Sequence, residues 1–161
     1  TDAEFCAFAT GAVQRSGARI CFEITETAVI RDPVVAMSSI AAFRAAGIQI
    51  SLDDYGSGLS GLSYLKQIEA DELKLDKSLI RNLTKRDTLI LKSTIDLAHG
   101  LGMSVVAEGV EDEATLAVLS ALGCDKVQGY LIARPVALAD FARLCAPAEP
   151  AAAENLQRFQ N

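Results

Sequence analysis

The sequence has 161 residues, 50% of them hydrophobic, and a net charge of −6. This length and composition predict one soluble α/β domain or a large piece of one, and the acidic balance excludes a general surface for DNA or RNA, which needs a basic patch. No apolar run approaches the roughly 20 residues of a membrane span, and no signal-peptide pattern opens the chain, so we expect a cytoplasmic domain, whether or not its parent protein is tethered to a membrane.

Segments with the periodicity of helices and of strands alternate along the chain. Glycines close several helices, and Asp32 and Pro33 open one as its N-cap and its first helical residue. In chain order we predict a helix over 2–14, a strand over 19–25, a helix over 33–46, a strand over 48–53, a glycine-rich loop over 54–61, a helical turn over 62–68, a strand over 72–75, helices over 78–83 and 87–100, a strand over 103–107, a helix over 113–122, a strand over 126–131 and a helix over 138–144.

This order is typical of a parallel βα repeat. Five strands are visible, whereas a closed eight-stranded barrel takes about 250 residues. The chain also begins at Thr1 rather than at a methionine, so we expect about five βα units of an incomplete (β/α) TIM-type barrel; an open five-stranded sheet with helices on both faces is the alternative. Residues 1–145 are predicted to form this domain, and residues 146–161 an Ala/Pro-rich tail or linker.

Ionisable residues stand at the ends of four of the predicted strands: Glu23, the pair Asp53 and Asp54, Lys74, and Glu108. Because the carboxyl ends of parallel strands converge on one rim, carboxylates far apart in sequence are expected to share a pocket there. A cluster of like charges needs a cation, and oxygen-rich clusters suit hard divalent metals. The sequence therefore predicts a metal-dependent enzyme domain.

Each of these residues also has a simpler interpretation. Glu23 fits an ordinary salt bridge at a strand end, and the aspartate pair fits a turn before glycines, although adjacent carboxylates also suit two-metal phosphodiester cleavage. Lys74 and Asp76 fit an internal ion pair. Gln128 fits either a hydrogen bond to a base or water, or a structural amide. The single histidine, His99, lies in a predicted helix away from the rim and is assigned a structural role.

Together these residues, in this order, resemble the EAL-type cyclic di-GMP phosphodiesterases, a family of bacterial second-messenger signalling proteins. The resemblance implies a (β/α) barrel that hydrolyses cyclic di-GMP to linear pGpG with two Mg²⁺ or Mn²⁺ ions. The matching segments are Phe22-Glu23-Ile24-Thr25-Glu26, Leu52-Asp53-Asp54-Tyr55-Gly56-Ser57-Gly58, Lys74-Leu75-Asp76, Ala107-Glu108-Gly109-Val110-Glu111, and Gln128-Gly129-Tyr130 with Arg134-Pro135.

The resemblance also implies roles for individual residues. It makes Glu23 and Asp53 ligands of a first metal, with Asp53 bridging to a second. Asp54 and Glu108 would hold that second metal, and Glu108 is also the candidate general base. Lys74 would position the attacking water.

Around this centre the resemblance implies supporting groups. Glu26 would anchor the mobile loop over 54–61, which in this family links metal occupancy to dimerisation, so a homodimer through the barrel is expected. Upstream sensory or cyclase domains are common in such parent proteins. The supporting or substrate-binding residues would be Asp76, Glu111 and Gln128, and the loop residues Gly56, Ser57 and Gly58.

Two features of the family are absent from the sequence: the Glu-Ala-Leu segment and a metal-binding asparagine that precedes the first helix. The chain therefore resembles the carboxyl-terminal two-thirds of an EAL domain. We expect the parent protein to be a cyclic di-GMP phosphodiesterase and the isolated chain to be inactive. The alternative is a catalytically inactive EAL-like module that binds cyclic di-GMP or another protein.

Overall fold

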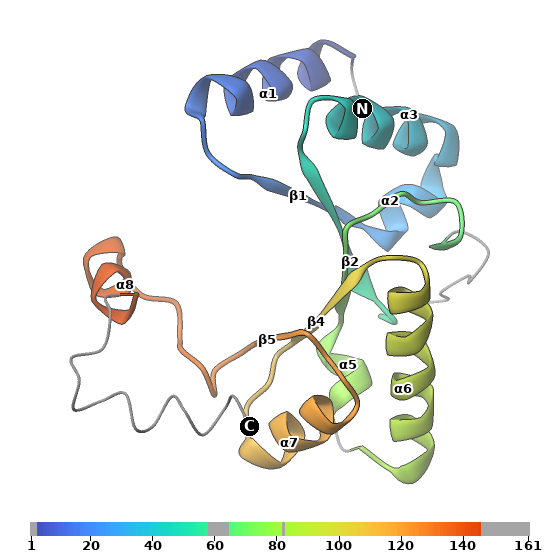
Figure 1. Cartoon of the computed structure of the whole chain (residues 1–161), viewed down its shortest axis with the longest axis vertical. Coiled ribbons are helices and arrows are strands. Elements are labelled where there is room, and N and C mark those ends of the chain that lie inside the picture. Colours follow the sequence, from blue (N-terminus) through green and yellow to red (C-terminus); the bar gives the residue numbers. More distant parts are fainter. Residues whose placement is uncertain (1–2, 58–64, 82, 146–161) are drawn as a thin grey trace.

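The centre of the molecule is a parallel sheet of five strands in the order β1-β2-β3-β4-β5, seen in the computed structural model, which describes residues 3–57, 65–81 and 83–145 (Figure 1). Every pair of neighbouring strands is parallel. Each strand follows the preceding one through a helical connection or a loop, as the sequence predicted. The strands are β1 Cys21–Thr25, β2 Gln49–Tyr55, β3 Glu72–Leu75, β4 Ser104–Glu108 and β5 Lys126–Gln128.

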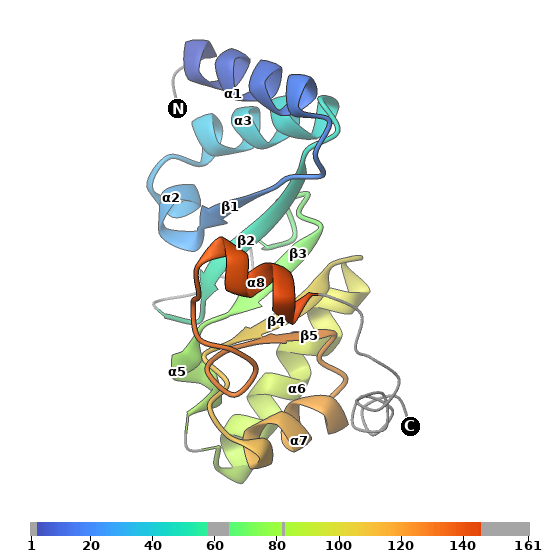
Figure 2. The same ribbon diagram turned by 90° about the vertical axis from the view of Figure 1, so that its left-hand side faces the viewer.

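The helices lie beside the sheet, and α8 stands apart from the others in Figure 1; in the turned view of Figure 2 it lies in front of the sheet. α8 buries none of its side chains. No helix in the described part of the chain has the length and hydrophobicity of a membrane span. The helices are α1 Ala3–Ser16, α2 Glu26–Arg31, α3 Pro33–Ala45, α5 Lys77–Ile80, α6 Lys85–Gly100, α7 Glu113–Ala121 and α8 Leu138–Leu144.

The two faces of the sheet differ in chemistry. In β3, Leu73 and Leu75 are fully buried in the hydrophobic core, whereas Glu72 and Lys74 alternate with them and point to the other face. Apolar side chains of β2 and β4 join the same core, together with residues of α3 and α6. A sheet covered by helices on both faces would be apolar on both, so the polar second face argues against the alternative of an open sheet with helices on both faces.

Most element boundaries lie within a few residues of those predicted, and three differences have a visible cause. The short helix α2 was not predicted; the side chain of Thr25 caps it by accepting a hydrogen bond from the N–H of Ala28. Helix α6 begins two residues earlier than expected, because Thr84 and Asp87 form a reciprocal capping box. Strand β5 ends at Gln128 rather than at residue 131, because the chain turns at Gly129 and the N–H of Leu131 donates to the carbonyl of Val110. The predicted turn over 62–68 and the tail over 146–161 lie largely or wholly outside the described residues.

Two aspartates at the amino ends of β3 and β5 tie a helix to the sheet in the same way. Each accepts a hydrogen bond from a backbone N–H of the neighbouring strand in the sheet. Each also contacts a basic side chain in the last turn of the helix that precedes this neighbouring strand in the sequence, and all these distances are 2.7–2.9 Å. His99 is therefore a structural residue, as predicted. The partners are Arg44 and the N–H of Ile50 for Asp71, and His99 and the N–H of Val105 for Asp125.

Candidate metal-binding active site

Lys74 is the centre of the candidate site. Its Nζ lies 2.9 Å from Glu23 Oε1, 3.0 Å from Asp53 Oδ1 and 2.7 Å from Glu108 Oε1. These three carboxylates come from β1, β2 and β4, and the lysine side chain is only 7% exposed. The predicted convergence of distant acids on one rim is therefore confirmed for Glu23, Asp53 and Glu108.

The lysine remains charged in this environment. Burial by itself lowers the pKa of Lys74, but the contacts with Glu108, Glu23 and Asp53 outweigh burial and raise the pKa above its ordinary value. The ammonium group offsets part of the negative charge that the acids bring together. Lys74 thus forms internal ion pairs, and the partners in these pairs are the rim acids Glu23, Asp53 and Glu108.

A β-bulge places Asp54 beside Asp53. The pairing of β2 with β3 shifts between Leu52 and Tyr55, so that two residues of β2 lie opposite one of β3. Asp54 has φ 59°, the only positive φ of a non-glycine residue in the described ranges. In a regular strand two adjacent side chains point to opposite faces. The bulge breaks this alternation, and β2 consequently extends to Tyr55, two residues beyond the predicted end.

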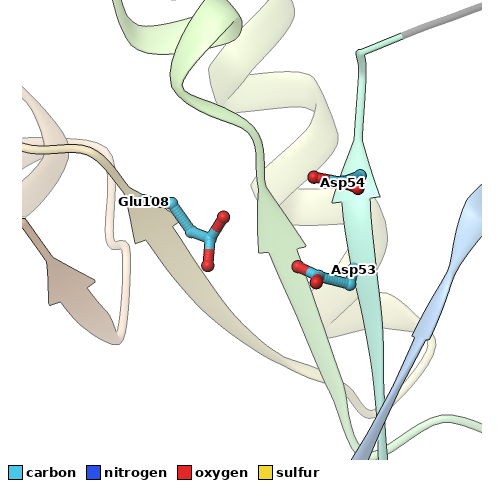
Figure 3. A group of neighbouring side chains, drawn as sticks. All are labelled: Asp53, Asp54 and Glu108. Atoms are coloured by element: carbon cyan, nitrogen blue, oxygen red, sulfur yellow. The ribbon is translucent and has the colours of Figure 1, made fainter.

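Asp53, Asp54 and Glu108 form a cluster of oxygen ligands. One carboxylate oxygen of each lies within 4.8 Å of the others, and Figure 3 shows the side chains of β2 and β4 directed toward the strand between them. Asp53 Oδ1 is buried and has no hydrogen bond of good geometry, although Lys74 is close. Three carboxylates gathered this closely form an all-oxygen cluster that fits a hard divalent cation such as Mg²⁺ or Mn²⁺.

The segment after β2 begins with a glycine that no other residue can replace easily. Gly56 has φ +93°, and a Cβ built on it would lie 2.3 Å from Leu79 Cδ1. The N–H of Ser57 donates to the carbonyl of Asp54 and closes a turn directly after the bulge. Glu26, the first residue of α2, lines a small cavity with Tyr55. Gly58 lies outside the described residues.

The other predicted supporting residues occupy different positions. Asp76 caps α5 by accepting a hydrogen bond from the N–H of Ser78 at 2.9 Å. Its pKa is lowered chiefly by a hydrogen bond from the Ser78 side chain, with a smaller contribution from this backbone N–H. Gln128 ends β5 and pairs in register with Glu108. Glu111 is exposed beyond β4 and lines a cavity of about 370 Å³. The structure thus places Gln128 in register beside the rim residue Glu108. One carboxylate oxygen of Asp76, by contrast, accepts a hydrogen bond from a backbone N–H.

Comparison with known proteins identifies the family. The model of the EAL domain matches residues 2–135, so the chain belongs to the EAL domain family. It is 39% identical over 119 residues to the bifunctional diguanylate cyclase/cyclic di-GMP phosphodiesterase MucR of Pseudomonas aeruginosa, covering 73% of this chain and 17% of MucR. It is 38% identical over 133 residues to the cyclic di-GMP phosphodiesterase NbdA of the same organism, covering 80% of this chain and 17% of NbdA.

Solved structures agree with this assignment. The MucR phosphodiesterase in complex with cyclic di-GMP has a TM-score of 0.80 and 34% identity, over 88% of this chain and 59% of that one. A manganese and cyclic di-GMP complex of BlrP1 from Klebsiella pneumoniae has a TM-score of 0.78 and 32% identity, over 83% of this chain and 36% of that one. The fold is thus an incomplete TIM-type barrel, and the chain spans less than a fifth of the two curated relatives.

Proposed function

We propose that the protein containing this chain hydrolyses cyclic di-GMP to linear pGpG with two divalent cations, Mg²⁺ or Mn²⁺. The observation that carries the proposal is the cluster of Asp53, Asp54 and Glu108, in which one carboxylate oxygen of each residue lies within 4.8 Å of the others. Membership of the EAL family and the names of MucR and NbdA support cyclic di-GMP as the substrate. The manganese complex of BlrP1 supports the choice of metal.

The proposed roles follow from the donor set. Glu23 and Asp53 would hold one cation, and Asp53 would share the second with Asp54 and Glu108. Two cations held by these residues would supply positive charge opposite the phosphodiester and would lower the pKa of the attacking water. Because Lys74 contacts Glu23, Asp53 and Glu108 at 2.7–3.0 Å, its ammonium lies where it can donate a hydrogen bond to that water and orient it.

The remaining residues are proposed to act around the reacting atoms. Glu108 would accept the proton of the attacking water as general base. Gln128, beside Glu108 in register, would hold the substrate with Glu111, and Asp76 would support Lys74 by fixing the start of α5. Glu26 would anchor the loop that begins at Gly56, Ser57 and Gly58 and that links the site to a homodimer partner. We further propose that the isolated chain is inactive and that upstream sensory or cyclase domains regulate the parent protein.

The decisive experiment compares Glu108→Gln with the unmodified protein, both made as the parent protein that contains this chain. The substitution keeps the size of the side chain and removes one charge from the cluster, so we expect turnover of cyclic di-GMP to fall by at least about 100-fold. Product release is measured by chromatography of pGpG in the presence of Mn²⁺. Glu113→Gln is the matched control, because Glu113 is exposed in the first turn of α7, outside the cluster, and its turnover should be unchanged.

The outcomes separate an enzyme from a binding module. Hydrolysis by the unmodified protein and its loss in Glu108→Gln support the proposal. An unmodified protein that binds cyclic di-GMP tightly and releases no pGpG at saturating Mn²⁺ would instead be the inactive module. Near-normal turnover by Glu108→Gln would exclude Glu108 as both ligand and base.

A further inference from the structure

A second polar layer lies on the inner face of the sheet, one step below Lys74. Its centre is Glu72, two residues before Lys74 and on the same face. Glu72 Oε1 accepts a hydrogen bond from the hydroxyl of Ser51 at 3.1 Å, and Oε2 accepts one from Lys126 Nζ at 2.6 Å. The hydroxyl of Ser104 lies 3.5 Å from Oε2. One carboxylate on β3 thereby links to β2, β4 and β5.

This layer lies directly beneath the candidate site. Ser51 precedes Asp53 by two residues on β2, and Lys126 precedes Gln128 by two on β5, so each pair shares a face of its strand. Ser51 is fully buried, and the side chain of Glu72 is 19% exposed. A carboxylate so shielded from water depends on its partners, because an unpaired buried charge is costly.

The backbone ladder fixes which residues of neighbouring strands pair, but strand β3 separates Asp53 on β2 from Glu108 on β4. Their carboxylates meet because both side chains reach over β3 from either side (Figure 3). Two side chains make links across β3: Lys74 in the upper layer and Glu72 in the lower one.

Cations bound at the rim would compete with Lys74 for the same carboxylate oxygens. Lys74 Nζ contacts one oxygen each of Asp53 and Glu108, and both residues belong to the proposed cation cluster. The links that Glu72 makes to Ser51, Ser104 and Lys126 involve no member of that cluster. Cations at the rim would therefore not compete for the oxygens of Glu72.

We propose that Glu72 is a positioning residue for the cation site: it holds β2, β4 and β5 against β3 so that the rim carboxylates keep the separation that divalent cations require. This inference rests on the proposed function, since it assigns Glu72 a role toward the cations of that site. Groups that orient metal ligands from outside the coordination shell typically contribute about 10–100-fold in metal affinity or activity. Glu72 differs from such groups in acting through strand positions, because it contacts none of the proposed ligands in the described part of the chain.

The test measures Mn²⁺ binding by direct titration without substrate, alongside turnover and thermal unfolding. Glu72→Leu removes all three links, and we expect Mn²⁺ binding about 10-fold weaker, with turnover partly restored at high Mn²⁺. Glu72→Gln keeps an acceptor for the two serine hydroxyls and should weaken binding by less, about 2–3-fold. Glu69→Gln is the matched control: it removes one carboxylate charge just before β3, from a side chain that is 81% exposed, and should leave Mn²⁺ binding unchanged.

A lower unfolding temperature with unchanged Mn²⁺ affinity and turnover in Glu72→Leu would overturn the proposal, because Glu72 would then stabilise the fold alone. If Glu72→Leu does not fold, Glu72→Gln and Lys126→Met decide, and unchanged Mn²⁺ affinity in both overturns it. The proposed function is tested separately: it fails if the unmodified parent protein binds Mn²⁺ but does not hydrolyse cyclic di-GMP, whatever the Glu72 variants show.

Discussion

Replacing Asp54 with glycine should stabilise the protein without metal and remove most of the stabilisation that Mn²⁺ provides. Asp54 has φ 59°, a backbone conformation that costs an L-residue about 1 kcal/mol and costs glycine almost nothing. Its carboxylate also lies within 4.8 Å of two others, and one like-charge pair at that distance costs about 1 kcal/mol at the dielectric constant of water. Both costs disappear in Asp54→Gly.

The opposing contribution comes from the unfolded chain. Glycine increases the conformational entropy lost on folding, which costs about 0.4–1 kcal/mol. The net expectation is a gain of about 1 kcal/mol in the free energy of unfolding without metal. Asp54→Ala relieves the charge repulsion but keeps the strained backbone, so it should be less stable than Asp54→Gly.

With Mn²⁺ bound, we expect the unmodified protein to be more stable than Asp54→Gly, the reverse of their order without metal. A ligand at 100 times its Kd stabilises the unmodified protein by about 2.7 kcal/mol, whereas a variant that binds it 100-fold more weakly gains only about 0.4 kcal/mol at the same concentration. Denaturant titrations followed by circular dichroism, with EDTA or with Mn²⁺, measure both quantities. If Asp54→Gly is less stable than the unmodified protein without metal, the backbone argument is wrong. If it keeps the full stabilisation by Mn²⁺, Asp54 is not a ligand.

Two further predictions concern the scaffold. Gly129→Ala should destabilise the protein by about 1–3 kcal/mol, because a Cβ at this position would lie 2.1 Å from the carbonyl oxygen of Val110. Gly100→Ala is the control: a Cβ built there meets no neighbouring atom within 4 Å, so this variant should be neutral or slightly stabilising in the same denaturant titration. Burial raises the pKa of Asp125, but the contacts with His99 and a backbone N–H outweigh burial and lower this pKa below its ordinary value. The stability that the carboxylate contributes is therefore present above the ordinary pKa and is lost as the pH falls through the lowered one. Asp125→Asn should flatten the acid limb of the curve of stability against pH, and an unchanged acid limb would contradict this contribution.

The sequence predicted the parts of the fold and site that depend on local pattern. The predicted cap at Asp32 is present, since its side chain accepts a hydrogen bond from the N–H of Val35. Strand β3 has the predicted limits. The meeting of Glu23 with Glu108 at one lysine followed from the rule that parallel strands end on one rim.

Other features depend on contacts that no local pattern reveals. Strand periodicity places Asp53 and Asp54 on opposite faces, and only the bulge brings them together. The role of Glu72 requires knowing that β2, β4 and β5 all present a polar group at its level. Strand β5 looks longer in the sequence because Tyr130 and its neighbours have strand composition, yet the close approach of Gly129 to Val110 ends the strand.

One sequence signal for the site becomes clear from the structure. Three rim acids each lie six residues after a glycine that follows a helix and has a positive φ. Because such a glycine ends the helix and fixes where the next strand enters the sheet, and because side chains alternate with a period of two, an equal spacing places each acid on the same face. Inserting or deleting one residue in this interval would turn the acid into the apolar core. Lys74 has no such glycine and is positioned instead by Asp71, three residues earlier, which accepts a hydrogen bond from β2. The glycine and acid pairs are Gly17 and Glu23, Gly47 and Asp53, and Gly102 and Glu108.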